Sequence, residues 1–559
     1  AEPYIHLNNS VGSFNTWKNT VALGSGLIDD HFVLDARLSR ISSDGFIDRA
    51  FSDLKSLYLS GGWYGDRSIL RFNLITGKEK TYQAWNGIPE DILKTNRTYN
   101  EFTYPDQTDN YTQTHYQLHF SNQVAPDFNW SISGNYTRGA GYYEEYKEDQ
   151  DFGDYGLKTI RIGDSLIEST NLVRRRWLDN HFYGLTGHAN WSPAESLDFT
   201  LGGAFYQYIG DHYGEVIWAE YTSDSFIGDR YYFNDALKND GNTFLKTTWS
   251  NDHLAVFMDL QARFLYYSFL GIDRFGESLE QDDVLAFFNP KIGFTYHVGQ
   301  DSQWYGSLAK GSREPNRDDY TEGPENLRPK AEELYDLEAG YRFNSTTHRF
   351  SANLYYMKYI NQLVLNGEIN DVGTYIRTNV RDSYRLGVEI SEQYAFNHQW
   401  QVGGNIALSI NRIPEFSQFL DVYDEAFNFV GQQETVHENT TIAFSPSVVG
   451  HAQITYYPVD ALSLTWESKY VSRQYMDNTT NIERSIDPYF FNNLRVAFDK
   501  SMFGLKNLRL ALDLKNLFNT SYETNGYTFG YIYDGRRSDF NYYYPQAGFH
   551  FMFSLNINI

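Results

Sequence analysis

Three consecutive arginines, Arg174-Arg175-Arg176, form the sharpest candidate for binding chemistry in the sequence. Arginine grips carboxylates and similar anions through two parallel hydrogen bonds, so the triplet is a candidate site for an anionic ligand. The simpler alternative is a set of salt bridges within the same segment, or attraction to phosphate groups at a membrane surface. The acidic candidates for such salt bridges are Glu144, Glu145, Glu148, Asp149 and Asp151.

Aromatic and histidine side chains extend the set of candidate ligand contacts. Trp85, Tyr142, Tyr143, Trp218 and Tyr531 fall in long polar segments and are candidates for the lining of a binding vestibule, although aromatic residues also serve as interfacial belts. His212, like His181 and His437, is placed by the pattern in a loop, where binding residues concentrate. His115 and His119 share one strand face, and hydrogen-bonded wall residues are the simpler interpretation.

Catalysis finds little support in the sequence. It contains no Gly-x-Ser-x-Gly and no His-Glu-x-x-His motif, and without cysteine it has no thiolate chemistry. We therefore expect no enzyme activity, no cofactor and no resident metal. The formal charge of -25 disfavours nucleic acid as a partner, because phosphate contacts require clustered basic residues.

The sequence pattern predicts that the elements that hold these residues are β-strands. Alternation with a period of two is clearest near the end, where Leu508, Leu510, Leu512 and Leu514 alternate with polar or small residues, and in the final segment 549–559. The chain is 17% aromatic and yet polar, with a mean hydropathy of -0.54. A barrel wall explains both, since each strand alternates residues that face lipid and lumen, and aromatic girdles mark the membrane interfaces.

Short and long connections alternate along the chain. Short links occur at 26–30, 64–67, 123–127, 192–196, 250–252, 299–302, 344–347, 397–398 and 459–461, and between them lie long polar links that include 77–111, 138–182, 209–243, 268–283, 313–329, 412–445 and 518–543. Tight periplasmic turns and long extracellular loops are typical of transmembrane β-barrels. With 3–9 as the first strand and 374–396 as one long strand, the pattern predicts an all-β, antiparallel barrel of about 22 strands, with both chain ends on the periplasmic side.

A barrel of this width cannot be filled by its own side chains, and barrels of this size have a plugged lumen. We find no segment that reads as a plug, so residues 1–559 are predicted to form the barrel domain, and an N-terminal plug domain is expected to be absent from them.

Several segments resemble the TonB-dependent outer-membrane receptors, specifically their iron-complex-receptor branch. The start of the barrel is similar in 12–16, 35–39 and 43–50, and the stretch from Asp109 through Tyr111 and His115 to Leu118 also resembles that branch. Near the C-terminus, Leu514-Lys515-Asn516-Leu517-Phe518-Asn519, with Tyr522 and Gly526, is similar to the late-barrel motif of the family.

The resemblance implies active uptake across the cell outer membrane of Gram-negative bacteria, energised by TonB, ExbB and ExbD, with an iron-siderophore or similar iron chelate as the expected ligand. Cobalamin, an oligosaccharide or a peptide, handed over with a surface lipoprotein, is the alternative within transport. A passive or structural barrel in a larger complex is the alternative outside it. Membrane lipid and lipopolysaccharide are further expected partners.

The haem-receptor branch of the family carries two further short motifs. Ser312-Arg313-Glu314-Pro315 and Pro324-Glu325-Asn326-Leu327 stand at similar positions here, but no histidine lies between them. The resemblance therefore does not favour haem as the ligand.

Overall fold

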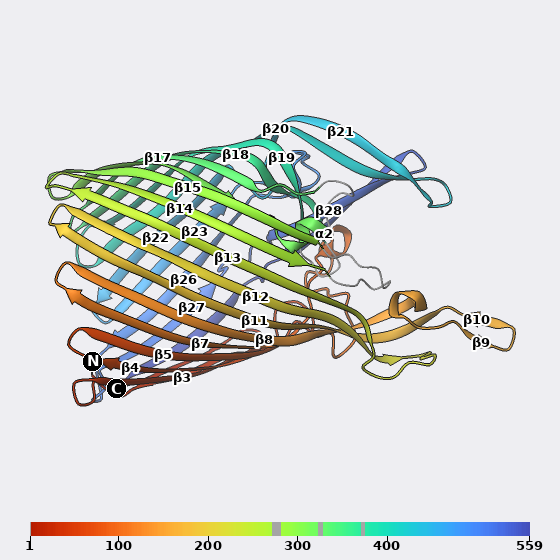
Figure 1. Cartoon of the computed structure of the whole chain (residues 1–559), viewed down its shortest axis with the longest axis horizontal. Helices are drawn as coiled ribbons and strands as arrows, with labels where there is room; N and C mark the ends of the chain where they lie inside the picture. Colours follow the sequence, from red (N-terminus) through yellow and green to blue (C-terminus); the bar gives the residue numbers. More distant parts are fainter. Residues whose placement is uncertain (1, 271–280, 322–327, 370–374) are drawn as a thin grey trace.

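The computed structural model describes residues 2–270, 281–321, 328–369 and 375–559, and they form a closed antiparallel barrel of 22 strands (Figure 1). The barrel prediction and its strand count are confirmed. In chain order the wall strands are β1 (Tyr4–Gly12), β2 (Thr16–Gly24), β3 (Phe32–Ser43), β4 (Ser52–Tyr64), β5 (Ser68–Tyr82), β7 (Thr108–Ala125), β8 (Phe128–Asp151), β11 (Ser169–Ala194), β12 (Leu197–Ala219), β13 (Arg230–Ser250), β14 (Leu254–Phe269), β15 (Gln281–Val298), β16 (Ser302–Arg313), β17 (Glu332–Asn344), β18 (His348–Ile369), β19 (Tyr375–Ala395), β20 (Trp400–Tyr423), β22 (Val448–Val459), β23 (Leu462–Val471), β26 (Tyr489–Lys500), β27 (Asn507–Lys515) and β30 (His550–Asn558).

Closure of the barrel joins the first and last strands. β1 pairs with β2 on one side and with β30 on the other, in a register that sets His6 against Asn558 and Gly12 against Met552. Closure leaves no strand edge exposed to lipid, which is the condition for spanning a membrane with strands. Both chain ends lie at the same end of the barrel, as expected (Figure 1).

The end that carries the chain termini is also the end of the short turns. The nine short links predicted from the sequence all lie at turns between consecutive wall strands. Some of these turns are fixed by local hydrogen bonds, as where the Asn397 side chain accepts from the backbone N–H groups of Gln399 and Trp400.

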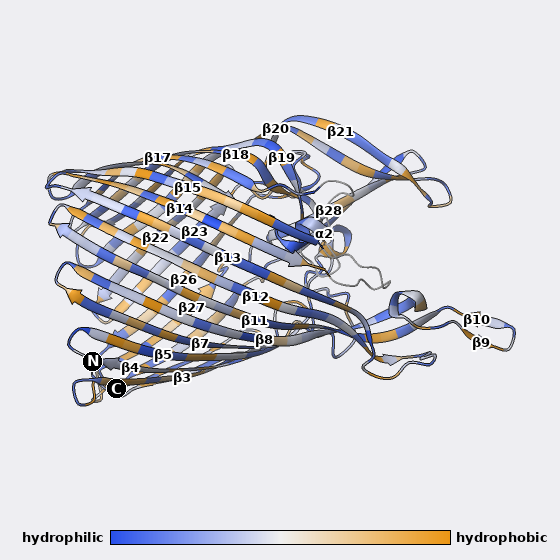
Figure 2. Cartoon of the chain, viewed as in Figure 1, coloured by the Kyte–Doolittle hydropathy of each residue, from blue (hydrophilic) through white to orange (hydrophobic). Residues whose placement is uncertain are grey.

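The wall presents apolar side chains outward and polar ones inward. Leu201, Leu308 and Leu337 are 59%, 54% and 53% exposed on the outer face, and Figure 2 shows hydrophobic and hydrophilic positions alternating along the strands. Near the short turns, tryptophans gather on the outer face, as expected of an interfacial girdle. They include Trp63, Trp191, Trp249, Trp304 and Trp400, each more than a third exposed.

The long segments are more regular than the sequence pattern indicated. β8, β11, β12, β13 and β20 run far beyond the membrane, so that most of 138–182, 209–243 and 412–445 is paired strand. The long extracellular loops predicted there are present, and they are built largely from strand extensions. The extensions were not apparent from the sequence pattern because they leave the lipid, so that alternation of apolar and polar residues is no longer required, although the backbone still pairs.

Smaller elements complete the long-loop end. The β20–β21 arm projects from the barrel, as do β8 and β11 with the β9–β10 hairpin (Figure 1). None of the helices among the described residues has the length and apolar character needed to cross a membrane. The smaller elements are β6 (Ile88–Pro89), α1 (Glu90–Leu93), the 3-10 helix η1 (Phe152–Tyr155), β9 (Ile160–Ile162), β10 (Ser165–Ile167), α2 (Arg317–Thr321), β21 (Phe429–Thr441), β24 (Gln474–Tyr475), β25 (Ser485–Ile486), β28 (Glu523–Tyr533) and β29 (Arg536–Pro545).

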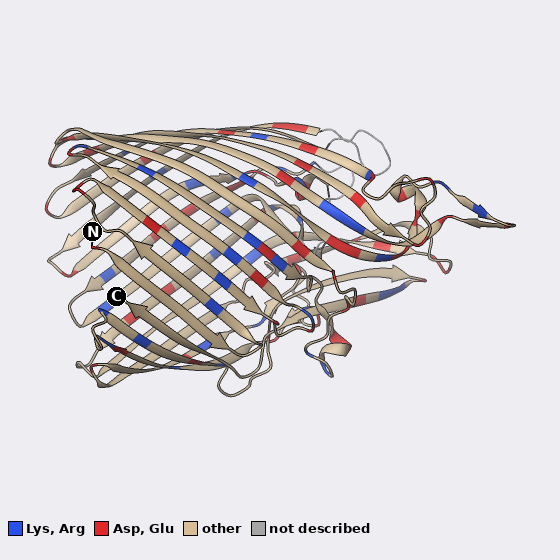
Figure 3. Ribbon diagram, turned by 90° about the horizontal axis from the view of Figure 1, so that it is seen from below, with Lys and Arg blue, Asp and Glu red and all other residues tan. Residues whose placement is uncertain are grey.

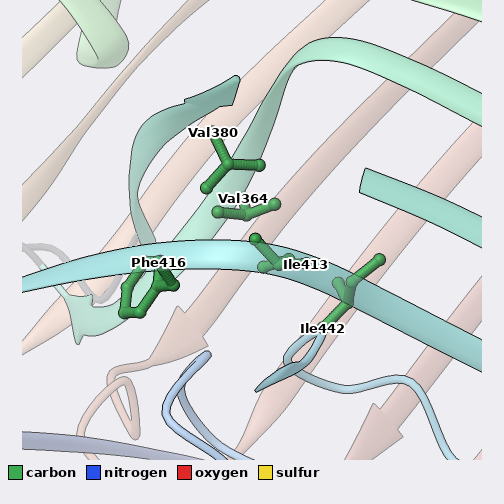
Figure 4. Close-up of a cluster of buried hydrophobic side chains, with 5 residues drawn as sticks. All are labelled: Val364, Val380, Ile413, Phe416 and Ile442. Carbon is green, nitrogen blue, oxygen red and sulfur yellow. The ribbon is translucent and has the colours of Figure 1, made fainter. Parts of the chain in front are cut away.

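A true hydrophobic core occurs where the β20–β21 arm meets the barrel. Val364, Val380, Ile413, Phe416 and Ile442 pack together there, and each is at most 5% exposed (Figure 4). These side chains come from β18, β19 and β20 and from the segment after β21, so the core fixes the arm to the wall.

Candidate ligand-binding site at the barrel mouth

The segment between β5 and β7 folds back across the long-loop end of the barrel, here called the mouth. The Gln83 side chain donates to the carbonyl of Glu144 over 3.1 Å, and the Tyr544 hydroxyl donates to the carbonyl of Trp85 over 2.5 Å. Arg97 forms an ion pair of 2.6 Å with Glu523. Segment 83–107 is thereby tied to strands on both sides of it in the barrel.

A second segment, 314–321 with helix α2, is held at the mouth by ion pairs. Glu314 contacts Lys238 at 2.9 Å and Arg263 at 2.8 Å, and Arg263 also contacts Asp240 at 2.7 Å. Burial alone would raise the pKa of Glu314, but the hydrogen bonds from Arg263 and Lys238 outweigh burial and lower this pKa to about 2. Glu314 therefore stays charged and fixed at neutral pH.

Helix α2 makes further contacts with the wall. Arg377 of β19 donates two hydrogen bonds to the carboxylate of Asp319, at 2.8 and 2.7 Å, and both side chains are largely buried. Tyr320 donates to Asp283 over 2.6 Å. Such bidentate pairs add geometric specificity as well as energy, so α2 has one defined position in the mouth.

The arginine triplet lies in strand β11, not in a loop, and its neighbour β8 supplies the counter-charges. Arg174 contacts Glu145 at 2.8 Å, and Arg175 contacts Glu144 at 2.8 Å. Arg174 and Glu145 are 8% and 1% exposed, so this pair is buried. The salt-bridge alternative weighed for the triplet is thus what the structure shows for Arg174 and Arg175.

Arg176, the third arginine of the triplet, contacts two tyrosines. Its guanidinium carbon lies 5.6 Å from the ring centres of both Tyr143 and Tyr232, and its Nε donates to the Tyr232 hydroxyl over 3.2 Å. Trp85 packs edge-on against Tyr143 with ring centres 5.1 Å apart. Trp85, Tyr143 and Arg176 therefore form one cation–π cluster at the mouth.

The opposite face of the same ladder carries Tyr142. Side chains alternate along a strand, so Arg175 and Trp177 point away from Arg174 and Arg176. The Arg175 guanidinium carbon lies 4.3 Å from the centre of the Tyr142 ring, which also contacts Trp177 at 4.6 Å. The six candidates in 85, 142–143 and 174–176 are close in space but divided between two faces.

The three remaining candidates lie on other strands, β12 and β28. His212, on β12, faces Arg317 at 3.3 Å and Tyr208 at 3.4 Å, so it belongs with the α2 segment. Trp218 is 49% exposed near the end of β12. Tyr531 lies on β28, where its ring packs against Tyr423 and Phe427.

The structure places the other histidines considered from the sequence in strands. His115 and His119 of β7 contact Thr137 and Ser133 at 2.8 Å each, so their role as hydrogen-bonded wall residues is confirmed. The expectation that His181, His212 and His437 lie in loops is wrong, because they occupy β11, β12 and β21. Segment 324–327 lies outside the described residues.

Sequence reasoning missed the residues that anchor the mouth segments. Glu314 was noted only as part of a short motif, and Lys238, Arg263 and Arg377 were not singled out. Glu314 and Lys238 are 76 positions apart in the sequence, and the structure brings them together through the barrel register. Figure 3 shows acidic and basic residues interspersed toward this end of the molecule.

Inside the barrel, the half near the short turns is polar. A hollow of about 770 Å³ is lined there by residues of β15 to β22, including His297, Arg342, Arg349, Glu392 and His451. A polar lumen inside a closed wall that is apolar on its outer face is typical of an outer-membrane barrel.

The chain belongs to the TonB dependent receptor-like, beta-barrel family, which matches residues 28–517. The family and fold are those of transporters and receptors, not of enzymes, and they place the protein in the outer membrane. The short-turn end accordingly faces the periplasm and the mouth faces outward. No curated protein sequence matches the chain.

Solved structures of two iron-complex receptors and a copper transporter share the fold. The closed form of the ferric-catecholate import receptor Fiu from E. coli K12 has a TM-score of 0.70 at 13% identity, over 100% of this chain and 82% of that one. The copper transporter OprC has a TM-score of 0.73 at 13% identity, over 100% and 80%. The ferric yersiniabactin receptor FyuA from Yersinia pestis has a TM-score of 0.71 at 12% identity, over 100% and 80%.

Proposed function

We propose that this protein takes up an iron chelate across the outer membrane, energised through TonB with ExbB and ExbD. Family membership supports TonB dependence, and the iron receptors among the structural neighbours support the cargo. The observation that carries most weight is the anchored mouth. A passive pore gains nothing from a segment fixed by two carboxylates, the partly buried Glu314 and the buried Asp319, whereas a receptor needs a gate above its lumen.

A folded plug inside the polar lumen completes this proposal. The barrel is too wide to be filled by its own wall, and the hollow near the periplasmic turns offers arginine, histidine and glutamate side chains to a polar partner. In this scheme TonB moves the plug, and lipopolysaccharide surrounds the outer rim. A surface lipoprotein would be required only if the cargo were an oligosaccharide or a peptide.

The proposed ligand contact is the cation–π cluster of Trp85, Tyr143 and Arg176. Aromatic rings and a guanidinium offer flat surfaces and positive charge, which suit an anionic chelate with planar iron-binding groups. Arg174 and Arg175 pair with Glu145 and Glu144 and lie outside this proposed contact.

Uptake of radioactive iron by cells tests both parts of the proposal. A strain that lacks the gene is complemented with wild type, Trp85→Ala or Tyr143→Ala, and is supplied with single catecholate, hydroxamate or citrate chelates of iron. We expect one chelate to depend on the gene and on TonB, and both variants to reduce its uptake. Trp304→Ala, in the girdle near the short turns, is the matched control and should transport normally.

Two results would contradict the proposal. Uptake that persists without TonB would indicate a passive pore. If the gene were required only for uptake of cobalamin, an oligosaccharide or a peptide, the cargo would not be an iron chelate. Surface labelling of each variant ensures that a loss of uptake is not a loss of protein from the membrane.

A further inference from the structure

Strand β21 leaves one of its two edges open outside the membrane. It comprises 13 residues, Phe429–Thr441, and among the described residues it forms a ladder with β20 alone. The two strands make the arm that projects from the barrel (Figure 1). An open edge presents a row of unpaired backbone N–H and C=O groups, to which another extended chain can add.

The sequence of β21 lacks the residues that most often block such an edge. Lysine and proline are the usual protection against strand addition, and β21 contains no lysine, arginine or proline. Phe429, Val430 and Val436 are 59%, 60% and 54% exposed. Its acidic residues, Glu434 and Glu438, repel a strand of like charge but attract one of opposite charge, so the edge is selective and not closed.

The arm as a whole is acidic. Residues 413–441 contain no lysine or arginine, and their acidic residues are Glu415, Asp421, Asp424, Glu425, Glu434 and Glu438. Two arginines act electrostatically on His437 of β21, but each has its own carboxylate partner outside the arm. Arg484 pairs with Asp477, and Arg537 pairs with Asp539. The negative charge of the arm is therefore left for an external partner.

Two glutamates stand directly opposite each other in the ladder of the arm. The register sets Glu415 of β20 against Glu438 of β21. Side chains at directly opposite positions share one face of the sheet and lie close together, and like charges there are destabilising. A cation on the open side of β21 would offset this repulsion, so the ladder itself favours a cationic neighbour.

The side chains on this face of β21 define the pattern of a complementary strand. Glu434, Val436 and Glu438 lie at every second position and therefore point to the same face. A strand added at the open edge sets its own alternate side chains beside them. The complementary sequence has a basic, an apolar and a second basic residue, separated by single positions, and it reads the same in both chain directions.

We propose that β21 docks an extended, basic segment of a partner protein outside the cell, which adds to the arm as a further strand. Backbone hydrogen bonds at the open edge supply affinity, and the side chains of Glu434, Val436 and Glu438 supply specificity, which is the division of roles in strand addition. A second copy of this chain is disfavoured as the occupant because two acidic arms repel each other.

Titration of a labelled peptide against the purified, detergent-solubilised protein tests the proposal. The probe is Thr-Lys-Thr-Val-Thr-Lys-Thr with blocked ends. Fluorescence anisotropy measures its binding, and hydrogen exchange locates the contact. We expect saturable binding and slower exchange of β21 amides, because an added strand bonds the free N–H groups. The measurement needs neither TonB nor iron, so its outcome does not depend on the proposed transport function.

Two altered peptides separate the backbone from the charges. One has glutamate in place of both lysines and should not bind, because like charges oppose it. The other keeps the lysines but is N-methylated at every residue, which removes the backbone donors that a ladder requires. It should lose both the binding and the protection of β21 from exchange.

The double variant Glu434→Gln with Glu438→Gln keeps the shape of the strand and removes its charge. We expect it to weaken binding of the basic peptide roughly two- to thirtyfold, the combined worth of two cross-strand pairs of opposite charge. Glu425→Gln is the matched control, because Glu425 is exposed in the same arm but lies outside β21. It should bind like wild type. Hydrogen exchange of the free variants shows that the arm is intact.

Three outcomes would overturn the proposal. If the basic peptide does not bind, the charges of β21 serve only to protect its edge. Equal binding of the N-methylated peptide would indicate attraction by charge without an added strand. A dimer, detected by light scattering, in which β21 is protected from exchange before any peptide is added would make a second copy of the chain the occupant.

Discussion

The wall of the barrel and the extracellular cap share strands but are stabilised by different forces. Here the cap means the strand extensions beyond the membrane together with segments 83–107, 314–321, 472–488 and 516–549. In the wall, side chains such as Leu308 and Leu337 are more than half exposed and rely on lipid to cover them. In the cap, Ile413 and Met476 are fully buried by protein, as in a water-soluble domain.

The wall and the cap also differ in where their charged side chains lie. On the wall's outer face they are scarce, as lipid requires, whereas the cap buries ion pairs such as Arg174–Glu145 and Arg484–Asp477. The comparison teaches that the cap can be loosened while the barrel stays closed. A gate that moves during transport must have this property, because the wall cannot open in the membrane.

The largest expected effect comes from Glu145→Ala. It removes the buried carboxylate that contacts Arg174, and breaking a buried pair in this way costs about 3 to 5 kcal/mol. We expect the free energy of local opening of 140–180, measured by hydrogen exchange, to fall by that order. Migration of the unheated barrel on a gel should not change, and a barrel that unfolds together with the cap would contradict the division.

A second test compares two isoleucines on β20. Ile413→Ala creates a cavity in the core of the arm, where Ile413 is 0% exposed, and should cost about 2 to 5 kcal/mol of cap stability. Ile410→Ala is the matched control, because Ile410 is 51% exposed on the outer face and lipid can fill the space. Hydrogen exchange of β20 and β21 measures both, and equal losses would show that lipid does not substitute for protein packing here.

The sequence predicted the wall far better than the cap, and for a physical reason. Lipid on one face and water on the other impose strict alternation, as in Leu508 to Leu514, so strands and turns could be located. Beyond the membrane both faces of a strand meet protein or water, so the alternation of apolar and polar residues fades. For this reason the strands predicted in the regions of β11 and β12 are shorter than the strands in the structure. The arginine triplet was found from residue type alone. Whether its arginines bind a ligand or form salt bridges could not be decided from the sequence, because this depends on the strand register that sets Arg174 against Glu145.

The anchors of α2 could not have been predicted from the sequence. Glu314 meets Lys238 and Arg263 only because the barrel closes and three separate strands come together. No local pattern records such a meeting. The same holds for Arg484 Nε and Thr528 Oγ1, which are buried without a hydrogen-bond partner among the described residues, since burial of a single polar atom depends on elements far apart in the chain.

Acid should release the α2 segment before it affects the wall. The pKa of Glu314 is lowered to about 2, against an unfolded value of about 4.3. A depressed pKa contributes stability that is fully present above the unfolded value and is lost as pH falls through the folded one. Pepsin cleavage near 314–321 should therefore stay constant down to about pH 4.3 and rise between there and about pH 2.

Glu314→Gln provides the control for that pH profile. It should expose the segment to cleavage already at pH 4 to 5 and should abolish the Glu314-dependent rise at lower pH. A wild-type profile that rises above pH 5 would instead assign the release to another group.

The smallest effect is expected from the exposed ion pair Lys158–Asp224. Its charged atoms are 2.5 Å apart, no farther than in the buried pair of Arg174 and Glu145, but the two side chains are 77% and 62% exposed. Water and salt screen such a pair, and holding two mobile side chains together offsets most of the attraction. Lys158→Ala should therefore leave hydrogen exchange of 140–180 unchanged within error. If it opened this region as much as Glu145→Ala does, proximity and not burial would decide the strength of these pairs, and the cap would be held by its surface charges.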